Sequence, residues 1–316
     1  MDIHTGYGVR ITPSGGSATL IGGVENQSCP IDVEHMAKPS AGNPFASAGQ
    51  IVKVQPRGLF SSYQLDVLLP LLGLRGACLA GGVNPGLEMF QLAGEKCGAV
   101  KSGNVHRKLV IPNGLVVARS ISVSHRQSAQ MQCEALSVFD GTNAPVIVAE
   151  NQAAPTGLTH THEFTLGPIT VPLPGGGGSQ QLEGNLDLQI NFNNKAETDG
   201  GDSDPHDTHI QVPEIIPDLT IKTRDIAKFK DSAIPLKGLH MEHTTFSVVL
   251  RRYLRAQAGF SDAAEHIKLT FDGMLNFEEV WNAQANKRGE ASLKFTALDD
   301  NTNAPIVSDV AFDLTP

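Results

Sequence analysis

One short phrase occurs in both halves of this chain. Near residue 140 the sequence reads Phe139-Asp140-Gly141-Thr142-Asn143-Ala144-Pro145, and near residue 299 it reads Leu298-Asp299-Asp300-Asn301-Thr302-Asn303-Ala304-Pro305. A repeat at about half the length of a 316-residue chain predicts one structural unit used twice. The alternative is a chance likeness between two turns.

The likeness extends upstream at a constant spacing. Asn113-Gly114 precedes Asp272-Gly273 by the same number of positions as Asp140 precedes Asp299. We interpret both glycine-containing pairs as turns that close β-hairpins, because glycine adopts a positive φ at little cost. The spacing predicts two domains, residues 1–155 with an extended N-terminal arm and residues 156–316 with an acidic loop insertion.

Composition favours a mainly β (α+β) fold. The chain has 32 Gly and 19 Pro, and runs such as 116–123 are rich in β-branched residues. One helix is expected in each domain. The first begins near Tyr63, after Ser61 and Ser62, and ends at Pro70 or Gly73. The second is predicted by apolar residues at helical spacing, namely Phe246, Val249, Leu250, Tyr253 and Leu254.

The cysteines and the apolar stretches bear on the cellular compartment. Cys29, Cys78, Cys97 and Cys133 form no C-x-x-C pair, and we expect them to be reduced. The N-terminus has no signal-peptide pattern, and the most apolar stretch, 65–82, is interrupted by charged residues and proline. These features predict a soluble protein made in the cytoplasm, with no membrane partner.

The net charge of −9 is unevenly distributed. Residues up to 157 carry 10 acidic and 11 basic side chains, whereas the rest carries 23 and 13. Nine carboxylates lie between Glu183 and Asp218, where Lys195 is the single lysine or arginine, and this run would repel a nucleic-acid backbone. We interpret 192–210 as a long polar loop whose role is open; a solvated loop is the simplest reading.

Four histidines are candidates for metal binding. His160 and His162 alternate on a predicted extended segment, and His206 and His209 lie among aspartates. Exposed loop histidines are the alternative, since neither pair belongs to a closed ligand motif.

The segment that begins at Asp199 resembles a calcium loop only loosely. Its twelfth residue is Ile210, which cannot close a calcium site. Glu278 and Glu279 are neighbours on a predicted strand, so they face opposite ways and cannot act together on one bond. We therefore predict no catalytic residue, no cofactor and no metal.

Arg251, Arg252 and Arg255 would lie on the polar side of the second predicted helix. They could contact phosphate or a neighbouring subunit, or form a solvated face.

The phrase Phe139-Asp140-Gly141-Thr142-Asn143-Ala144-Pro145-Val146, with its second occurrence at 298–307, resembles the C-terminal part of tail-tube proteins of tailed bacteriophages. The resemblance covers about a third of the chain and rests on a short turn. It implies two tandem β-sandwich or half-barrel domains, each with one flanking helix. It also implies rings whose inner strands join into one barrel, and stacking of those rings into a hollow tail tube.

The resemblance makes the chain a structural virion protein rather than an enzyme. Its implied partners are other copies of itself, in trimeric pseudo-hexameric rings, other tail proteins, and viral DNA that passes through without specific binding. Alternatives are another tail or capsid component, such as a baseplate, decoration or attachment module, or an enzyme with a site built from scattered residues.

Overall fold

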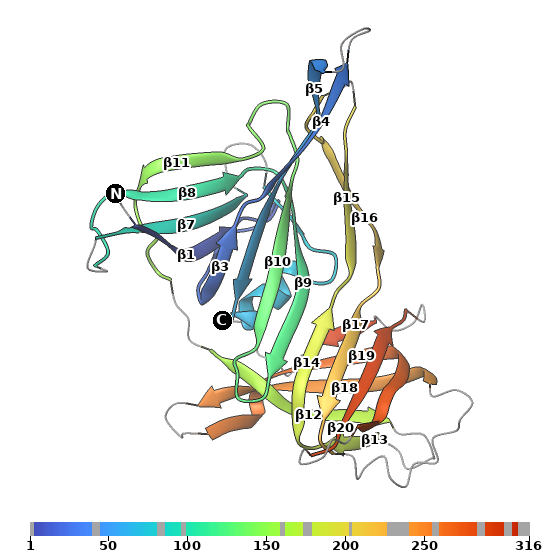
Figure 1. Ribbon diagram of the computed structural model, residues 1–316. Coiled ribbons are helices and arrows are strands. Elements are labelled where there is room, and N and C mark those ends of the chain that lie inside the picture. The colour runs from blue at the N-terminus through green and yellow to red at the C-terminus, as the bar shows by residue number, and fades with distance from the viewer. Residues whose placement is uncertain are drawn as a thin grey trace.

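The computed structural model describes residues 3–39, 45–80, 86–95, 99–158, 162–172, 179–201, 204–225, 240–254, 259–282, 288–299 and 305–308. Within these ranges the chain is mainly β, with large antiparallel sheets and one helix, so the expected fold class is confirmed at this level (Figure 1).

The smaller sheet belongs to the first half of the chain. Its strand order is β11-β8-β7-β1-β2, and every neighbouring pair is antiparallel. The strands are β1 (Ile3–Ile11), β2 (Thr19–Ile21), β7 (Leu87–Gly94), β8 (His106–Ile111) and β11 (Ile147–Gln152).

The large sheet crosses from one half of the chain to the other. Its order is β13-β12-β18-β19-β20-β17-β14-β9-β10-β5-β3. Strands from the first half are β3 (Val24–Ser28), β5 (Ala46–Ser62), β9 (Gly114–Ser124) and β10 (Gln130–Ser137). Strands from the second half are β12 (Phe164–Pro172), β13 (Ser179–Leu182), β14 (Asn185–Asn191), β17 (Asp218–Thr223), β18 (His240–Leu254), β19 (Gly259–Asn282) and β20 (Glu290–Ala297).

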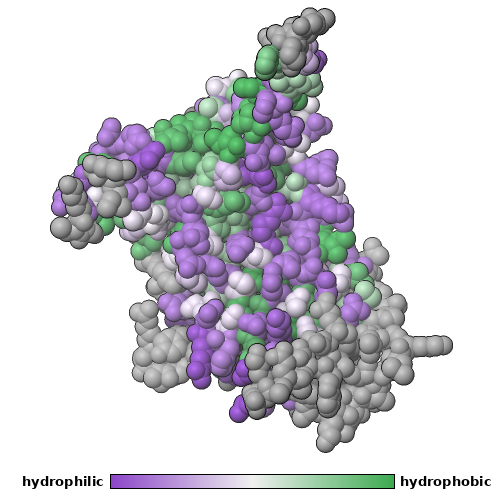
Figure 2. Space-filling view, in the orientation of Figure 1, coloured by the Kyte–Doolittle hydropathy of each residue, from purple (hydrophilic) through white to green (hydrophobic). Residues whose placement is uncertain are grey.

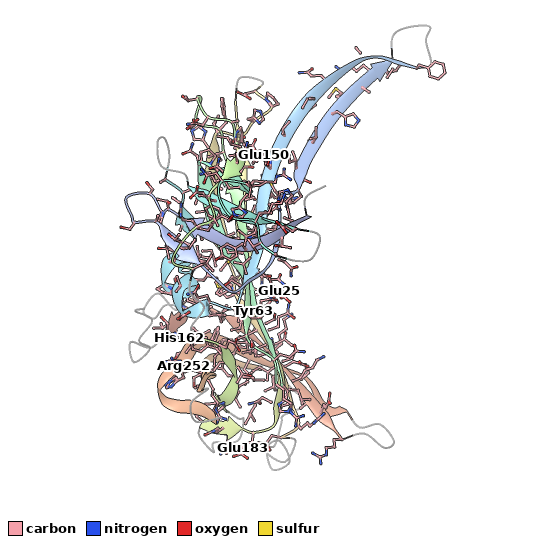
Figure 3. The ribbon with its side chains drawn as sticks, turned by 90° about the vertical axis from the view of Figure 1, so that its left-hand side faces the viewer. Glu25, Tyr63, Glu150, His162, Glu183 and Arg252 are labelled. Carbon is pink, nitrogen blue, oxygen red and sulfur yellow. The ribbon has the colours of Figure 1, made fainter. Side chains whose placement is uncertain are left out.

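Two hairpins extend beyond the body of the molecule on the same side (Figure 1). One is formed by β4 (Ile31–Pro39) with the first part of β5, and the other by β15 (Asn194–Asp199) with β16 (His209–Ile215). Figure 3 shows β4 and β5 as a long curved pair that leaves the sheet. The short strands β6 (Ala77–Cys78) and β21 (Ile306–Ser308) add to β9 and β19.

Alternating side chains place one face of each strand in the core. In β20 the odd positions are buried and the even positions are partly exposed, which is the period of a strand covered on one side. The core of the second half includes Phe246, Phe271 and Phe295, whose ring centroids lie 5.4–6.1 Å apart. These pairs have the tilted and edge-on contacts that aromatic rings prefer, together with one stacked contact.

Helix α1 (Leu65–Leu72) lies where the first helix was expected. It ends at Gly73, which has a φ of 56° and donates its N–H to the carbonyl oxygen of Leu69. The expected serine contributes indirectly, because the Ser62 hydroxyl accepts a hydrogen bond from the N–H of Gln64, the residue at the N-cap position.

The second predicted helix is wrong, because its residues form β18. Phe246, Val248 and Leu250 are buried while Val249 is not, so the side chains alternate with a period of two. The helical spacing in the sequence arose because apolar residues also occupy the partly exposed face of this strand. Pairing with β12 and β19 on its two sides decides the conformation.

Two further predictions, about the N-terminal arm and the acidic loop, need correction. Residues 1–50, predicted as an extended arm, form β1 to β4 and the start of β5 where they are described, and of these β4 and β5 make the projecting hairpin. The segment 192–210 is not a long loop, because β15 and β16 form a hairpin around a shorter connection. Glutamate and aspartate are tolerated there because alternate side chains point to solvent.

The two predicted hairpin turns are also wrong. Gly114 is the first residue of β9, which belongs to a different sheet from the preceding strand β8, and Gly273 lies inside the single long strand β19. What both glycines share is a close approach of another strand. A Cβ on Gly114 would lie 1.9 Å from the carbonyl oxygen of Leu136, and one on Gly273 would lie 2.1 Å from that of Thr296.

The strand pairings of the first half recur in the second at nearly constant spacing. Gly114 pairs with Ser137 as Gly273 pairs with Ala297, so both partners shift along the chain by almost the same interval. The same irregularity follows in both ladders. The pairings skip Arg119 in β9 and, at the matching position of β19, Glu278, so a β-bulge recurs.

A second set of pairings recurs at a similar spacing. Val24 pairs with Ser62 as Asn185 pairs with Thr223, and a register shift follows in each case. The hairpins match as well, since Lys38 lies opposite Ala48 and Asp199 opposite His209. The similarity of the two halves thus extends far beyond the repeated phrase.

The close approach at Gly114 gives a test of this arrangement. Gly114→Ala should lower the free energy of unfolding by about 2 kcal/mol or more, because the new Cβ overlaps a backbone oxygen that cannot rotate away. Urea unfolding measures the change. Gly201→Ala is the control, since no atom lies within 4 Å of a Cβ there. Equal stability of the two variants would contradict the described packing.

Candidate assembly interface

The two halves of the chain are joined by main-chain pairing between β9 and β14. The register runs from Ser124 opposite Asp187 to Ser120 opposite Asn191. Two backbone hydrogen bonds extend it, from His125 N to Leu186 O at 2.6 Å and from Phe192 N to Arg119 O at 2.9 Å. We call this pairing the seam. It makes one continuous sheet out of strands that are distant in the sequence.

The seam has an apolar side and a polar side. Ile121 and Ile190 lie opposite each other and are completely buried, and Phe192 is 2% exposed. Burying side chains of this size contributes about 1.5–3 kcal/mol each. The seam therefore belongs to the hydrophobic core as much as to the hydrogen-bond ladder.

The β-bulge residue Arg119 connects the seam to a buried carboxylate. Its Nε lies 2.5 Å from Oε2 of Glu134, and its Nη1 donates to the carbonyl oxygen of Asn194 in the second half. Arg57 approaches the other oxygen of Glu134 at 3.4 Å. A hydrogen bond to Asp32, with further help from Glu134, raises the pKa of the Arg57 guanidinium, so this cation stays charged.

The two hairpins also contact each other across the seam. The N–H of Val54 donates to the carbonyl oxygen of Pro205 at 2.8 Å, and the side chain of Gln55 donates to Thr198 at 2.6 Å. Lys53 lies 2.9 Å from Asp207, and both side chains are at least two-thirds buried. The connection between β15 and β16 is thereby held against β5.

The face of the large sheet that turns away from the core is polar and mixed in charge. Figure 2 shows this hydrophilic surface over β9, β10 and β14. Its partly or fully exposed side chains come from alternate positions of neighbouring strands, namely Ser120, Ser122, Gln132, Asp187, Gln189, Asn191, Asp218, Thr220, Lys222 and Lys294. We call it the open face. Half of these ten residues are serine, glutamine or asparagine, and two aspartates balance two lysines, so the open face lacks the basic character of a nucleic-acid site.

Several strands of the large sheet have an unpaired edge within the described part of the chain, for example β13, which pairs there with β12 alone, and two of these edges repeat the strands of the seam. β3 is a terminal strand of this sheet and pairs on one side with β5. The last residues of β19, Phe277–Asn282, pair with β20 on one side, whereas the pairing with β18 stops at Asn276. In the repeated register, β3 corresponds to β14 and this part of β19 corresponds to β9. The two edges therefore match the two sides of the seam.

A hollow of about 240 Å³ lies beside β3. It is lined by Gln27, Cys29, Leu109 and Val148 among others. At the positions of β14 that match Gln27 and Cys29, Leu188 and Ile190 are buried. Burial raises the pKa of the half-buried Cys29 thiol, which keeps it protonated. The first half thus has an open space where the second half has packed side chains.

The repeated phrase itself forms a turn held by one aspartate. Oδ1 of Asp140 accepts hydrogen bonds from the N–H groups of Thr142 and Asn143 at 2.9 and 2.7 Å, and Asn113 donates to its other oxygen. These bonds, those from Asn143 first, lower the pKa of the Asp140 carboxyl well below its usual range. The phrase therefore has a local structural explanation, and its second occurrence lies partly outside the described residues.

The histidines and the arginines predicted as candidates are dispersed. His162 shares a 2.7 Å hydrogen bond with Asp66 of α1, and the His206 ring packs against Phe139. His160 and Arg255 lie outside the described residues. Arg251 and Arg252 are neighbours on β18 and so face opposite sides of a strand rather than sharing one face. Within the described ranges no three metal-ligating side chains gather.

The seam was not visible in the sequence. Its contacts are mostly main-chain hydrogen bonds, which any residue except proline can make. A signal was present in the serines that alternate with Ile121 and Val123, which predict a strand with one polar face, but the partner strand cannot be read from that pattern.

The salt bridge at the β-bulge predicts a measurable stabilisation. Arg119→Met should lower the free energy of unfolding by about 1–3 kcal/mol, because Glu134 stays buried and loses its closer cation. Arg224→Met is the matched control, since Arg224 lies 3.9 Å from Glu290 and both are exposed. Adding Glu134→Gln to Arg119→Met should recover part of the loss. An effect no larger than that of the control would contradict a role for Arg119 at the seam.

A comparison of the chain with models of protein families finds no match, and a comparison with curated proteins finds none either. In the part of the chain that the structure describes, no helix has the length and apolar character needed to cross a membrane. The function is therefore inferred from the seam, the open face and the two unpaired edges.

Proposed function

We propose that the chain is a structural virion protein that polymerises into rings, and that the rings stack into a hollow tail tube through which viral DNA passes. The duplication behind this proposal is supported by two ladders that share their register and a β-bulge as far as Glu279, after which β19 shifts register once more. Each half would be one tube domain, 1–155 and 156–316, in the manner of a β-sandwich or half-barrel.

The observation that carries the proposal is the seam. Within one chain, β14 of the second half pairs with β9 of the first. The second half of the same chain has a β9-like edge at Phe277–Asn282, and the first half has a β14-like edge at β3. A second copy can repeat the seam by pairing its β3 with β19, and this head-to-tail contact closes into a ring when the rotation is suitable.

The number of copies in the proposed ring is taken from the resemblance to tail-tube proteins, and the pseudo-symmetry is compatible with it. If every junction in the ring has the geometry of the seam, each chain contributes two equivalent units. Three chains then make a ring of six units, which is the arrangement that the resemblance to tail-tube proteins implies.

The open face suits the lumen of such a tube. It would form the inner wall of the closed sheet, where serine, glutamine and asparagine are hydrated and the few charges are of both signs. A wall of this kind offers DNA neither a lysine-rich track nor aromatic side chains on which bases stack. DNA would pass without being bound. The unpaired edges also argue against a monomeric enzyme, because a long free edge invites association.

Electron microscopy of the purified protein at rising concentration tests the proposal. Hollow rings or rods of uniform width should form, with three chains in each ring. Cys29→Lys should prevent assembly, because it places a charge at the position where the seam buries Ile190.

Gln132→Lys is the matched control, since it adds the same charge on the exposed open face. It should assemble like the unaltered protein. A chain that stays monomeric at high concentration would overturn the proposal, as would a Cys29→Lys variant that still forms tubes.

A further inference from the structure

Charged residues at matching positions of the two halves carry opposite signs. The matching follows from the strand pairings: Glu34 lies opposite Lys53 in the first hairpin, and Lys195 lies opposite Glu214 in the second. In the large sheet and the hairpins, the matched positions at which both residues are charged are Glu34 with Lys195, Lys38 with Asp199, Lys53 with Glu214, Arg57 with Asp218, Arg119 with Glu278, and Glu134 with Lys294. The sign is reversed in every one.

The seam shows what such charges do. The connection of the second hairpin lies against β5, and there Asp207 forms its 2.9 Å salt bridge with Lys53. Residues 197–209 at that hairpin's end include five carboxylates and neither lysine nor arginine. An acidic hairpin end therefore meets a lysine on the neighbouring half.

The first hairpin has the opposite charge at its end. Between residues 35 and 50 the single lysine, arginine, aspartate or glutamate is Lys38, which is exposed. The residue that matches Lys53 on the second half is Glu214, which is 39% exposed and is paired with the exposed Lys195 of its own hairpin. A basic hairpin end thus has an acidic counterpart, but on the far half of the chain.

We propose that the first hairpin of a second copy docks against β16 of this chain and brings Lys38 of that copy to Glu214. The position that matches Asp207 is Ala46, and Lys38 lies opposite Ala48, two residues further along β5. This inference rests on the proposed ring and names the polar contact of the junction between copies.

At the seam an acidic hairpin end meets Lys53, and at the proposed junction a basic hairpin end would meet Glu214. Both charges have changed sign, so the two surfaces remain complementary. At the seam the N–H of Val54 donates to Pro205, and the residue of β16 that matches Val54 is Ile215.

The reversal also selects the order of the halves. If the first half of another copy competed for β9, its Lys38 would approach Lys53 of this chain. If a second half approached β16, Asp207 would meet Glu214. Both arrangements bring like charges together, which is costly at an interface. Alternation of first and second halves is thereby favoured over pairing of identical halves.

Charge exchange between the two positions tests the inference. Lys38→Glu should raise the concentration at which half the protein sediments as assemblies by about threefold to tenfold at 50 mM salt, and by less at 500 mM salt. Glu214→Lys should have a similar effect. The double variant Lys38→Glu/Glu214→Lys should return to within about twofold of the unaltered protein.

Lys222→Glu is the control, because it makes the same change in net charge on the open face, away from both edges. Equal effects of Lys38→Glu and Lys222→Glu, or a double variant that is not restored, would overturn the Lys38–Glu214 contact while leaving a tube-forming protein in place. An unaltered chain that never assembles would overturn the ring and this contact together.

Discussion

An antiparallel strand edge can be paired only once, and the pairing of β9 with β14 determines how the rest of the molecule is arranged. The hydrogen bonds of the seam continue one sheet across the two halves, and buried Ile121 and Ile190 make the same contact part of the core. Because β9 and β14 satisfy each other, neither is available to another molecule. The edges left over in the described part of the chain include their counterparts, β3 and the end of β19, and these are the edges that the proposed ring would pair.

A repeated ladder inside one polypeptide has a directional consequence. The end of β19 in the second half offers the same kind of strand edge that β9 of the first half offers to β14. Successive molecules can therefore add in a head-to-tail manner rather than around a twofold axis. Geometry alone would permit either half of a second copy at a given edge. In the proposed ring, the charges of Lys38, Lys53, Glu214 and Asp207 would discriminate between them, in the way that natural interfaces combine attraction with repulsion.

The sequence predicted some levels of this structure and not others. The β-rich fold, helix α1 and the repetition followed from composition, local spacing and the turn phrase. The predicted helix at 246–254 was wrong because apolar residues at Phe246, Val249 and Leu250 satisfy a helical period while long-range pairing favours a strand. The role of Gly114 was misjudged because a glycine signals a conformational need without revealing whether a turn or a close approach causes it. The seam could not be predicted, because main-chain pairing between distant strands leaves no fixed pattern in side chains.

The register of the junction between copies is the most direct test. In the seam Ile190 lies opposite Ile121. Cys29 of one copy matches Ile190, and Val280 of the next copy matches Ile121 by the spacing that holds as far as Glu279, after which the pairing of β19 with β20 shifts register again. Directly opposed residues have Cα atoms about 4.5–5.5 Å apart, which suits a disulfide. Oxidation of assembled Val280→Cys protein should therefore give covalent multimers on a non-reducing gel. Glu279→Cys should not, because neighbouring positions of a strand face opposite sides of the sheet. The account is contradicted if Val280→Cys gives no multimers, or if they persist when Cys29 is replaced by serine.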